Sequence, residues 1–381
     1  MTESLVILGS TGSVGMQTID VARHLGVKID GLAARGTIKV LEQQIRLVNP
    51  RFCAVTDPDA ADRLRKSVSD LPVKVLGGDD AIYEMLALTD ADTVLNAVSG
   101  IAGLRPTIAA IQLGKKLALA NKESLVTYGT WVMNEAKRRG VDILPVDSEH
   151  SAIAQCLAGS SREQIRKLVL TASGGPFFGK SYDEMRRITP EIALAHPTWN
   201  MGKRITIDSA TMMNKGFEVI EAYHLFGVAP ECIDVVVHRE SIVHSMVEFN
   251  DSAVIAQMGV PDMRLCVQYA LTFPGRYNSP VKSLDLTTVG SLSFFKPDYE
   301  AFPLLPLAYR TLKRGGVVPA AMNAADEAAV ELFLIGKIGF TDIAKAVTEA
   351  TDACADIPEP TLDQVEEADR IAREAVYSLV R

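Results

Sequence analysis

The sequence is poor in cysteine, and the few cysteines are not arranged as a framework. Its 381 residues include five of them, widely scattered and without a Cys-x-x-Cys pair. An odd number excludes a complete set of disulfides, and the spacing excludes a zinc ribbon. We therefore expect five small, buried thiols in a protein of a reducing compartment.

The sequence also lacks an excess of basic residues and a long apolar run. A formal net charge of −8 argues against a general nucleic-acid binder, which usually shows a basic face. No secretory signal precedes the first expected strand, and no apolar run approaches membrane-spanning length. We expect a cytoplasmic protein that binds neither nucleic acid nor membrane. An anionic ligand would then need a local cluster of donors.

Aromatic residues are sparse as well, at 6% of the chain, whereas hydrophobic residues make up 48%. This balance is typical of an α/β protein, and the length indicates two or three domains. Through residue 150, short apolar runs alternate with helical periodicity, which predicts parallel βαβ units in a doubly wound, Rossmann-like sheet. The expected strands are residues 4–8, 28–34, 52–55, 93–98, 116–120 and 143–146, and the first expected helices are residues 16–24, 38–48 and 60–67.

After residue 150 the pattern changes to short strands with few long helices, which predicts an α+β domain with an open, partly antiparallel sheet. Helical periodicity returns near the C-terminus and predicts a helical domain. The expected later strands are residues 167–171, 205–207, 233–237, 245–249 and 253–257, and the expected helices are residues 306–314, 320–335, 341–351 and 362–380. The predicted domains are residues 1–150, 151–272 and 299–381, with a linker over residues 273–298.

A glycine-rich run, Gly9-Ser-Thr-Gly-Ser-Val-Gly15, follows the first expected strand and begins a helix. In that context glycines let the backbone approach a pyrophosphate, although they also make ordinary strand-to-helix turns. An acidic residue at the end of the second strand would bind the ribose of NAD, but Asp30 lies too early. Arg35 stands there instead and favours NADPH, unless it is simply a solvated surface charge.

Asp147 and Glu149 follow an expected strand at spacing i, i+2, so in an extended chain both side chains point the same way. Two adjacent carboxylates repel each other unless they share a proton or a cation. Glu218 is a candidate third oxygen ligand, and an all-oxygen set suits Mg²⁺ or Mn²⁺. Ordinary surface carboxylates are the alternative interpretation.

The segment from residue 196 to residue 218 carries more hydrogen-bonding groups than a core segment could satisfy. Short donors in it and in the run 172–176 suit a phosphate, and Asn214 lies one helical turn before Glu218. A His and a Trp on a loop indicate a cover over a site, although a lone His is more often structural. The candidate donors are Ser173, Ser209, Asn214 and Lys215; the cover candidates are His196 and Trp199; His150 and His244 are secondary candidates.

Asn121-Lys-Glu123 follows another expected strand, where open α/β sheets bind ligands. The same residues could also cap the next helix, and the two interpretations are compatible.

Several long runs are similar to those of one family, and the similarity extends essentially over the whole chain. The runs are Ile7–Gly15, Leu119–Ser124, Pro145–His150, Thr171–Phe177, His196–Glu218, Glu240–Met246 and Met322–Glu327. On these residues the chain resembles the 1-deoxy-D-xylulose 5-phosphate reductoisomerase family. The residues Arg35-Gly-Thr37 differ from the version common in that family, which leaves the adenosine contacts open.

The resemblance implies a role for each matching residue. Thr11, Gly12, Ser13 and Val14 would hold the NADPH pyrophosphate, Arg35 and Gly36 would lie near the adenosine phosphate, and Asn121 and Glu123 would face the nicotinamide half. Lys122 and Gly202 would also bind the cofactor. Asp147, Glu149 and Glu218 would bind Mg²⁺ or Mn²⁺. Lys122 and Ser148 would lie beside the substrate backbone, Ser173, Ser209, Asn214 and Lys215 would bind its phosphate, and His196, Trp199 and Met201 would cover it. The catalytic set would be Lys122, Asp147, Glu149, His196 and Glu218.

The resemblance also implies a reaction and an assembly. A homodimer, formed through the 151–272 domain, would use NADPH and a divalent cation to rearrange and reduce 1-deoxy-D-xylulose 5-phosphate. The product would be 2-C-methyl-D-erythritol 4-phosphate, an isoprenoid precursor of the non-mevalonate route. One rival is another NADPH-dependent dehydrogenase of the same architecture, which would not need a three-carboxylate metal site. The other is a Rossmann-type redox sensor, which should carry a DNA- or partner-binding module; no basic helix-turn-helix pattern is present.

Overall fold

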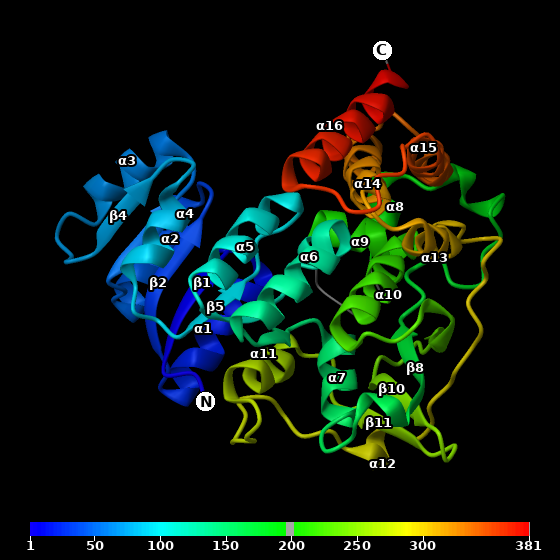
Figure 1. Cartoon of the computed structure of the whole chain (residues 1–381), viewed down its shortest axis with the longest axis horizontal. Coiled ribbons are helices and arrows are strands. Elements are labelled where there is room, and N and C mark those ends of the chain that lie inside the picture. Colours follow the sequence, from blue (N-terminus) through cyan, green and yellow to red (C-terminus); the bar gives the residue numbers. More distant parts are fainter. Residues whose placement is uncertain (196–201, 381) are drawn as a thin grey trace. The chain divides into compact units, whose positions relative to one another are not determined.

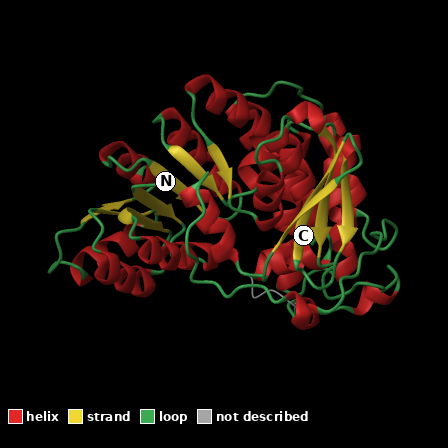
Figure 2. Cartoon of the chain, turned by 90° about the horizontal axis from the view of Figure 1, so that it is seen from below, coloured by secondary structure: helices red, strands yellow, loops and turns green. Residues whose placement is uncertain are grey.

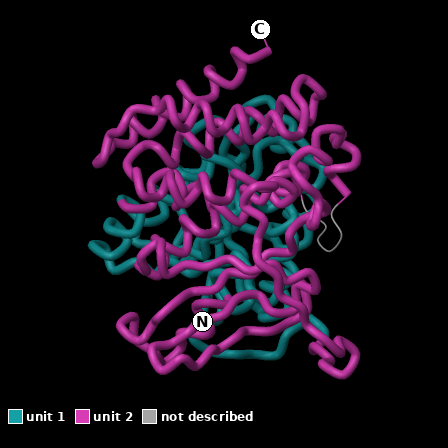
Figure 3. Tube along the Cα trace, turned by 90° about the vertical axis from the view of Figure 1, so that its right-hand side faces the viewer, with its two compact units in different colours: residues 1–121, 131–151, 262–282 teal, residues 122–130, 152–261, 283–381 magenta. Residues whose placement is uncertain are grey.

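The computed structural model describes residues 1–195 and 202–380, and the chain divides into two compact units (Figure 3). Unit 1 comprises residues 1–121, 131–151 and 262–282, and unit 2 comprises residues 122–130, 152–261 and 283–381. These divisions fall at other places than the expected domain boundaries, so the division into domains stays a prediction. The expected α/β class with a parallel sheet and C-terminal helices is confirmed.

Unit 1 contains a seven-stranded sheet in the order β4-β3-β2-β1-β5-β6-β7, and every neighbouring pair is parallel. Its strands are β1 (Ser4–Leu8), β2 (Lys28–Ala34), β3 (Phe52–Val55), β4 (Lys74–Gly77), β5 (Thr93–Asn96), β6 (Lys116–Leu119) and β7 (Ile143–Pro145). Residues 5–8 of β1 are fully buried, as expected for a strand covered on both faces. Because β1 lies between β2 and β5, the strand order reverses beside it, which is where such sheets bind ligands.

The helices of unit 1 follow the expected alternation, and local signals explain their ends. Asp57 caps α3 by accepting from Ala60 N at 2.8 Å, with Pro58 in the first turn, and Gly26 ends α1 in the left-handed region. The helices that lie wholly in this unit are α1 (Ser13–Leu25), α2 (Ile38–Val48), α3 (Pro58–Ser67), α4 (Ala81–Leu88), α5 (Leu104–Gln112) and α11 (Met263–Thr272) (Figure 1). Two further helices, α6 (Glu123–Arg139) and α7 (Ser148–Cys156), contain residues of both units.

Unit 2 contains a four-stranded sheet in the order β11-β10-β8-β9, in which only the β8–β9 pair is parallel (Figure 2). Its strands are β8 (Ile165–Ala172), β9 (Ile233–Val237), β10 (Val243–Phe249) and β11 (Val254–Met258). The prediction of an open, partly antiparallel sheet is therefore confirmed. Strand β11 is an edge strand with its first residues exposed.

The helices of unit 2 share one hydrophobic core with that sheet. Helix α14 is rich in alanine and buried along most of its length, and α16 and α15 pack against it. The helices are α8 (Pro190–Ala193), α9 (Lys203–Ala210), α10 (Met213–Phe226), α12 (Leu286–Val289), α13 (Leu304–Arg314), α14 (Val318–Leu334), α15 (Phe340–Asp352) and α16 (Leu362–Ser378). In the described part of the chain, every helix is too short or too polar to span a membrane.

One expected strand is wrong. The run Ile205-Thr-Ile207 consists of three β-branched residues, which favour a strand, but it lies inside α9, which begins after Gly202. The helix places Thr206, Ile207 and Ala210 on a buried face, so tertiary packing outweighs the weak local preference for a strand. Strand β4 (Lys74–Gly77) was not expected, because its short sequence has no apolar run.

Candidate active site

The glycine-rich loop follows β1 at the reversal of strand order, and it has no room for a side chain at Gly9 or Gly15. Gly9 has a φ of +78°, and a Cβ there would lie 2.5 Å from Ala97 O. A Cβ on Gly15 would collide with Gly9 O, so α1 starts directly against the loop. Gly12 is the N-cap of α1, and no side chain caps this helix start. This cradle fits a dinucleotide pyrophosphate. The expected contact residues Thr11, Gly12, Ser13 and Val14 all lie on it.

Gln44 holds this loop by two hydrogen bonds, although no sequence motif predicted that role. Ser10 Oγ donates to Gln44 Oε1 at 2.8 Å, and Gln44 Nε2 donates to Ser10 O at 2.8 Å. Both residues are buried, and Gln44 lies on the buried face of α2 beside Leu41 and Ile45. In the sequence, only the position of Gln44 on the apolar face of an amphipathic helix could have indicated that its side chain has a buried polar partner.

The end of β2 presents the expected cationic residue. Arg35 follows the strand and is exposed, next to the half-buried Gly36. Asp30 lies at the other end of β2, where Arg51 Nε donates to it at 2.6 Å. Burial alone would raise the pKa of Asp30, but hydrogen bonds from Arg51 and Thr89 lower it to about 2. Asp30 is therefore an anion held by hydrogen bonds within the fold, and it lies too early in β2 for the ribose contact, as expected.

Asn121 connects two loops at the carboxyl edge of the same sheet. It follows β6, and its backbone N–H donates to Asn96 O at 3.0 Å. Its side-chain amide donates to Val98 O at 2.7 Å and to Gly100 O at 2.9 Å. The amide thus fixes the loop after β5 against the segment that leads into α6. The next residues, Lys122 and Glu123, are buried.

Asp147 and Glu149 are close in space, but not for the expected reason. Strand β7 ends at Pro145 and α7 begins at Ser148, so the two carboxylates lie in a strand-to-helix turn and not in an extended chain. Asp147 Oδ1 accepts from Glu149 N at 3.3 Å, and Ser148 Oγ donates to Glu149 Oε2. The assumed extended geometry was wrong because an Asp before a helix start favours a turn.

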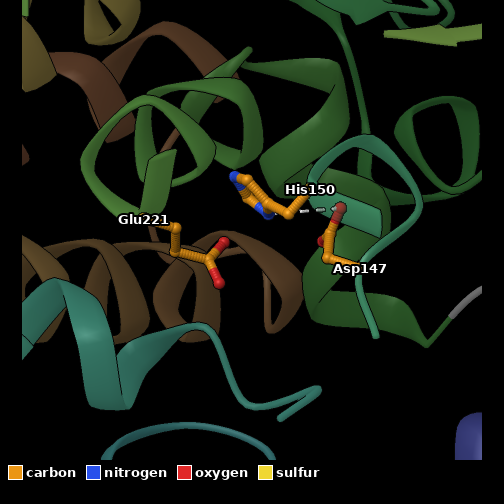
Figure 4. Close-up of side chains that lie close together, drawn as sticks. All are labelled: Asp147, His150 and Glu221. Atoms are coloured by element: carbon orange, nitrogen blue, oxygen red, sulfur yellow. Dashed lines mark ion pairs between the residues drawn. The ribbon is translucent and has the colours of Figure 1, made fainter. Parts of the chain in front are cut away.

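Two further groups surround these carboxylates within unit 1. His150 is fully buried, and its Nδ1 lies 3.7 Å from Asp147 Oδ1 (Figure 4). Burial, together with the charges of Asp147 and Glu149, raises the pKa of the Cys266 thiol on α11 to about 12. The thiol therefore stays protonated at neutral pH, and oxygen donors dominate this part of the site.

Glu218 is the corresponding buried carboxylate of unit 2. Its side chain is 1% exposed, although an isolated buried carboxylate would be strongly unfavourable. Asn214 Nδ2 donates to Glu218 Oε1 at 2.5 Å, which confirms that the two residues share a helix face. Lys215 forms an ion pair with it, and Lys122 Nζ lies at 3.7 Å from Glu218 Oε1 and donates to Asn214 Oδ1 at 2.5 Å.

Ser173 and Ser209 belong to segments that touch. Gly174 and Gly175 have φ values of +74° and +63°, and a Cβ on Gly175 would lie 2.7 Å from Ser209 O. Arg239 holds this turn, because its Nη1 donates to Ser173 O at 2.8 Å and to Gly175 O at 2.6 Å. Arg239 was not expected, although it directly precedes the similar run Glu240–Met246.

Arg204 is a second arginine that the sequence did not single out. Its Nη1 donates to Glu123 Oε1 at 2.9 Å and to Glu327 Oε1 at 2.7 Å, and its Nη2 donates to Asn323 Oδ1 at 3.1 Å. It therefore connects α9 with the start of α6 and with α14. No local pattern predicts this contact, because the partners lie 81 and 123 residues away.

The cover residues cannot be placed. His196, Trp199 and Met201 lie outside the described residues, and Gly202 is the exposed N-cap of α9. The secondary candidate His244 is buried within β10.

Three models of one family match successive parts of the chain. The 1-deoxy-D-xylulose 5-phosphate reductoisomerase model matches residues 5–129, and two models of its C-terminal domains match residues 143–226 and 258–375. The curated 1-deoxy-D-xylulose 5-phosphate reductoisomerase of Acetivibrio thermocellus is 50% identical over 381 residues, with 100% of each chain covered. The chain belongs to this reductoisomerase family.

Other members of the family agree in sequence and in structure. The enzyme of Caldanaerobacter subterraneus subsp. tengcongensis is 50% identical over 377 residues, with 98% of each chain covered. The solved reductoisomerase of Zymomonas mobilis in complex with NADPH is 42% identical, with a TM-score of 0.93 and 100% of each chain covered. A solved reductoisomerase in complex with NADPH, fosmidomycin and magnesium is 39% identical, with a TM-score of 0.94 and coverage of 99% and 98%.

Replacing Gln44 by Ala tests how the cradle is held. We expect Gln44→Ala to lower the free energy of unfolding by about 1–3 kcal/mol, because two buried groups of Ser10 lose their partner. Urea unfolding measures this change. Gln43→Ala is the matched control: Gln43 is its exposed neighbour on α2, and we expect a change within about 0.5 kcal/mol. Equal effects of the two substitutions would contradict the assignment.

Proposed function

We propose that the protein converts 1-deoxy-D-xylulose 5-phosphate to 2-C-methyl-D-erythritol 4-phosphate, with NADPH as reductant and Mg²⁺ or Mn²⁺ as cation. The carrying observation is its membership of the reductoisomerase family over the whole chain, at 50% identity. The relatives solved with NADPH and with magnesium support both cofactors. Unit 1 contains a cradle that fits a dinucleotide, and carboxylates that fit a hard cation lie in both units.

NADPH would supply the hydride, and residues of unit 1 would bind most of it. The first turn of α1 directs backbone amides and the positive end of the helix dipole at a pyrophosphate. The proposed contacts are Thr11, Gly12, Ser13 and Val14 for the pyrophosphate, Arg35 and Gly36 for the adenosine phosphate, and Asn121 and Glu123 for the nicotinamide half. Lys122 and Gly202 are further proposed cofactor contacts. Arg35 is exposed and so accessible to a 2′-phosphate.

Asp147, Glu149 and Glu218 would hold the cation, which would act as a Lewis acid on substrate oxygens. The chemistry of the donors supports this, because all three offer hard carboxylate oxygens and the neighbouring Cys266 stays a thiol. Glu218 is buried and already requires positive partners. We propose that a bound cation would replace part of that compensation.

The remaining residues would bind and orient the substrate. Ser173, Ser209, Asn214 and Lys215 would bind its phosphate, Lys122 and Ser148 would contact its backbone, and His196, Trp199 and Met201 would cover it. In the reaction one carbon–carbon bond breaks and another forms, which gives a branched aldehyde that is then reduced. A phosphate held far from the reacting carbons supplies binding energy for positioning and closure.

We retain two further predictions, a homodimer and a cytoplasmic location. The edge strand β11 supports the first, because Val254 and Ile255 are 55% and 47% exposed on it. An exposed apolar edge strand offers unpaired backbone groups with which a strand of another chain can pair.

The decisive assay follows NADPH oxidation with 1-deoxy-D-xylulose 5-phosphate in the presence of Mg²⁺ or Mn²⁺. We expect oxidation that stops on addition of EDTA and resumes when the cation is restored, with the branched polyol phosphate as product. Oxidation that persists in EDTA would instead favour a metal-independent dehydrogenase. Tight NADPH binding without oxidation would reject the proposed substrate.

Glu218→Gln tests the cation assignment. We expect kcat to fall on the order of 100-fold, because the amide keeps the shape but loses the charge that holds the cation. The fall should be largest at subsaturating Mg²⁺ or Mn²⁺. Glu231→Gln, on an exposed residue paired only with Lys313 in the described ion pairs, should leave kcat unchanged. Unchanged turnover of Glu218→Gln at low cation would reject the role.

Lys215→Ala tests the phosphate assignment. We expect KM for the substrate to rise by about 10-fold or more, since a charge-assisted hydrogen bond contributes roughly 1.5–3 kcal/mol. Steady-state kinetics measures the rise, with the exposed Lys203→Ala on α9 as control. An unaltered KM in Lys215→Ala would rule out the contact.

A further inference from the structure

The run Met322–Glu327 is shared with the family but has no role in the proposed site. It lies on α14, and its polar side chains converge on Arg204. Arg204 also reaches Glu123 at the start of α6, directly after Lys122. The hydrogen bonds to Glu123, Glu327 and Asn323 measure 2.9, 2.7 and 3.1 Å. The run therefore belongs to a polar cluster inside unit 2, which we call the Arg204 cluster.

Carboxyl groups outnumber cations in the Arg204 cluster. Arg204 is surrounded by four of them, and Arg373 of α16 binds one of these, Glu327, together with Asp369. If all were ionised, three negative charges would remain uncompensated in a largely buried region, which is strongly unfavourable. The carboxyl groups are Glu123, Asp208, Asp326, Glu327 and Asp369.

Asp326 is the group least able to carry a charge. It is fully buried, and neither of its oxygens accepts a hydrogen bond from an N–H or O–H donor within the described ranges. Arg204 Nη2 lies 3.8 Å from Asp326 Oδ2, and Arg204 Nε lies 3.6 Å from Asp208 Oδ2, both too far for hydrogen bonds. The carboxyl groups of Asp208 and Asp326 thus both face the same guanidinium from buried positions. Two buried carboxylates beside one cation repel each other, and a proton on one of them removes that repulsion.

We propose that Asp208 and Asp326 share one proton in the folded protein, and that this proton positions Arg204 on Glu123 and Glu327. With the proton in place, the pair carries one negative charge, and the guanidinium remains on the two glutamates. Without it, a second aspartate charge would draw Arg204 away from Glu123. Asp208 and Asp326 are thus positioning residues for the start of α6; their relevance to catalysis rests on the proposed function.

The neighbouring charges agree with the proton on Asp326. Burial raises its pKa well above the ordinary range, and the charge of Asp208 raises it further. Burial also raises the pKa of Asp208, but Arg204 opposes that rise, so Asp208 is the better anion. The charged groups that face the pair are Glu123 and Lys122 from the start of α6, Arg204 from α9, Glu327 from α14, and Asp369 and Arg373 from α16.

The shared proton has a defined effect on stability. In the unfolded chain an Asp titrates near pH 4, whereas folded Asp326 keeps its proton to higher pH. Its contribution is therefore full below the unfolded pKa and is lost as pH rises toward the folded pKa. Asp326→Asn keeps a donor of the same shape but does not titrate. Its stability relative to the original protein should consequently increase as pH rises.

Urea unfolding between pH 5 and pH 8 tests this in the full chain. We expect the unfolding constant of the original protein to rise about 10-fold per pH unit relative to that of Asp326→Asn. This holds over the pH range in which the folded original protein keeps the proton. Asp363→Asn, at an exposed position in the first turn of α16, is the matched control and should follow the original protein at all pH values. Parallel curves for Asp326→Asn and the original protein would overturn the proposal.

Infrared spectroscopy provides a second readout that a merely structural role would not change. The original protein at neutral pH should show the C=O band of a protonated carboxyl group, and Asp326→Asn should lack it. If Asp326→Asn does not fold, Asp208→Asn is measured in its place. That substitution should shift the C=O band of Asp326, because the proton of Asp326 then faces an amide instead of a carboxylate. An identical spectrum in the variant that folds would overturn the shared proton. A protein inactive toward 1-deoxy-D-xylulose 5-phosphate would overturn the proposed function but leave both readouts intact.

Discussion

The start of α6 depends on two opposite charges at adjacent residues, and much of unit 2 is arranged around them. Lys122 reaches Asn214 and Glu218 on α10, whereas Glu123 reaches Arg204 on α9. All these groups are buried or partly buried, so each depends on its partner to avoid a desolvated, uncompensated charge. The two pairs together hold one turn of backbone against two helices, α10 and α9, which is more than a single surface ion pair could do.

The backbone supports this arrangement with unusual conformations in a few places. Met212 has a φ of +60°, a position that costs a non-glycine residue free energy, and it joins α9 directly to α10. Because this connection is so short, Ser209 near the end of α9 is followed after only a few residues by Asn214 in the first turn of α10. Gly175 packs against the end of α9, and only a residue without a side chain leaves space there for Ser209 O. Strain and close approach are thus concentrated where the donors for the proposed phosphate site gather.

Sequence patterns predicted what depends on local periodicity and failed where distant partners decide. The strand over residues 28–34 and the helix over residues 38–48 were confirmed at their expected bounds, since burial on both faces and an amphipathic pattern are local properties. The strand expected at residues 205–207 was wrong because packing against α14 and α10 decides its conformation. Arg204, Arg239 and Gln44 were missed for the same reason, as their partners lie far away in sequence.

The protein has a formal net charge of −8, yet its proposed substrate is an anion. The two are compatible because a carboxylate holds two cationic side chains near the proposed phosphate site. Lys122 and Lys215 both lie against Glu218, so two positive charges are kept at a buried position where bulk counter-ions screen weakly. A phosphate would compete with Glu218 for these ammonium groups. The negative charge of Glu218 would then lack a positive partner unless a cation bound to that carboxylate. Binding of the cation should therefore raise the affinity for the phosphate, and binding of the phosphate should raise the affinity for the cation, because both ligands act on Glu218.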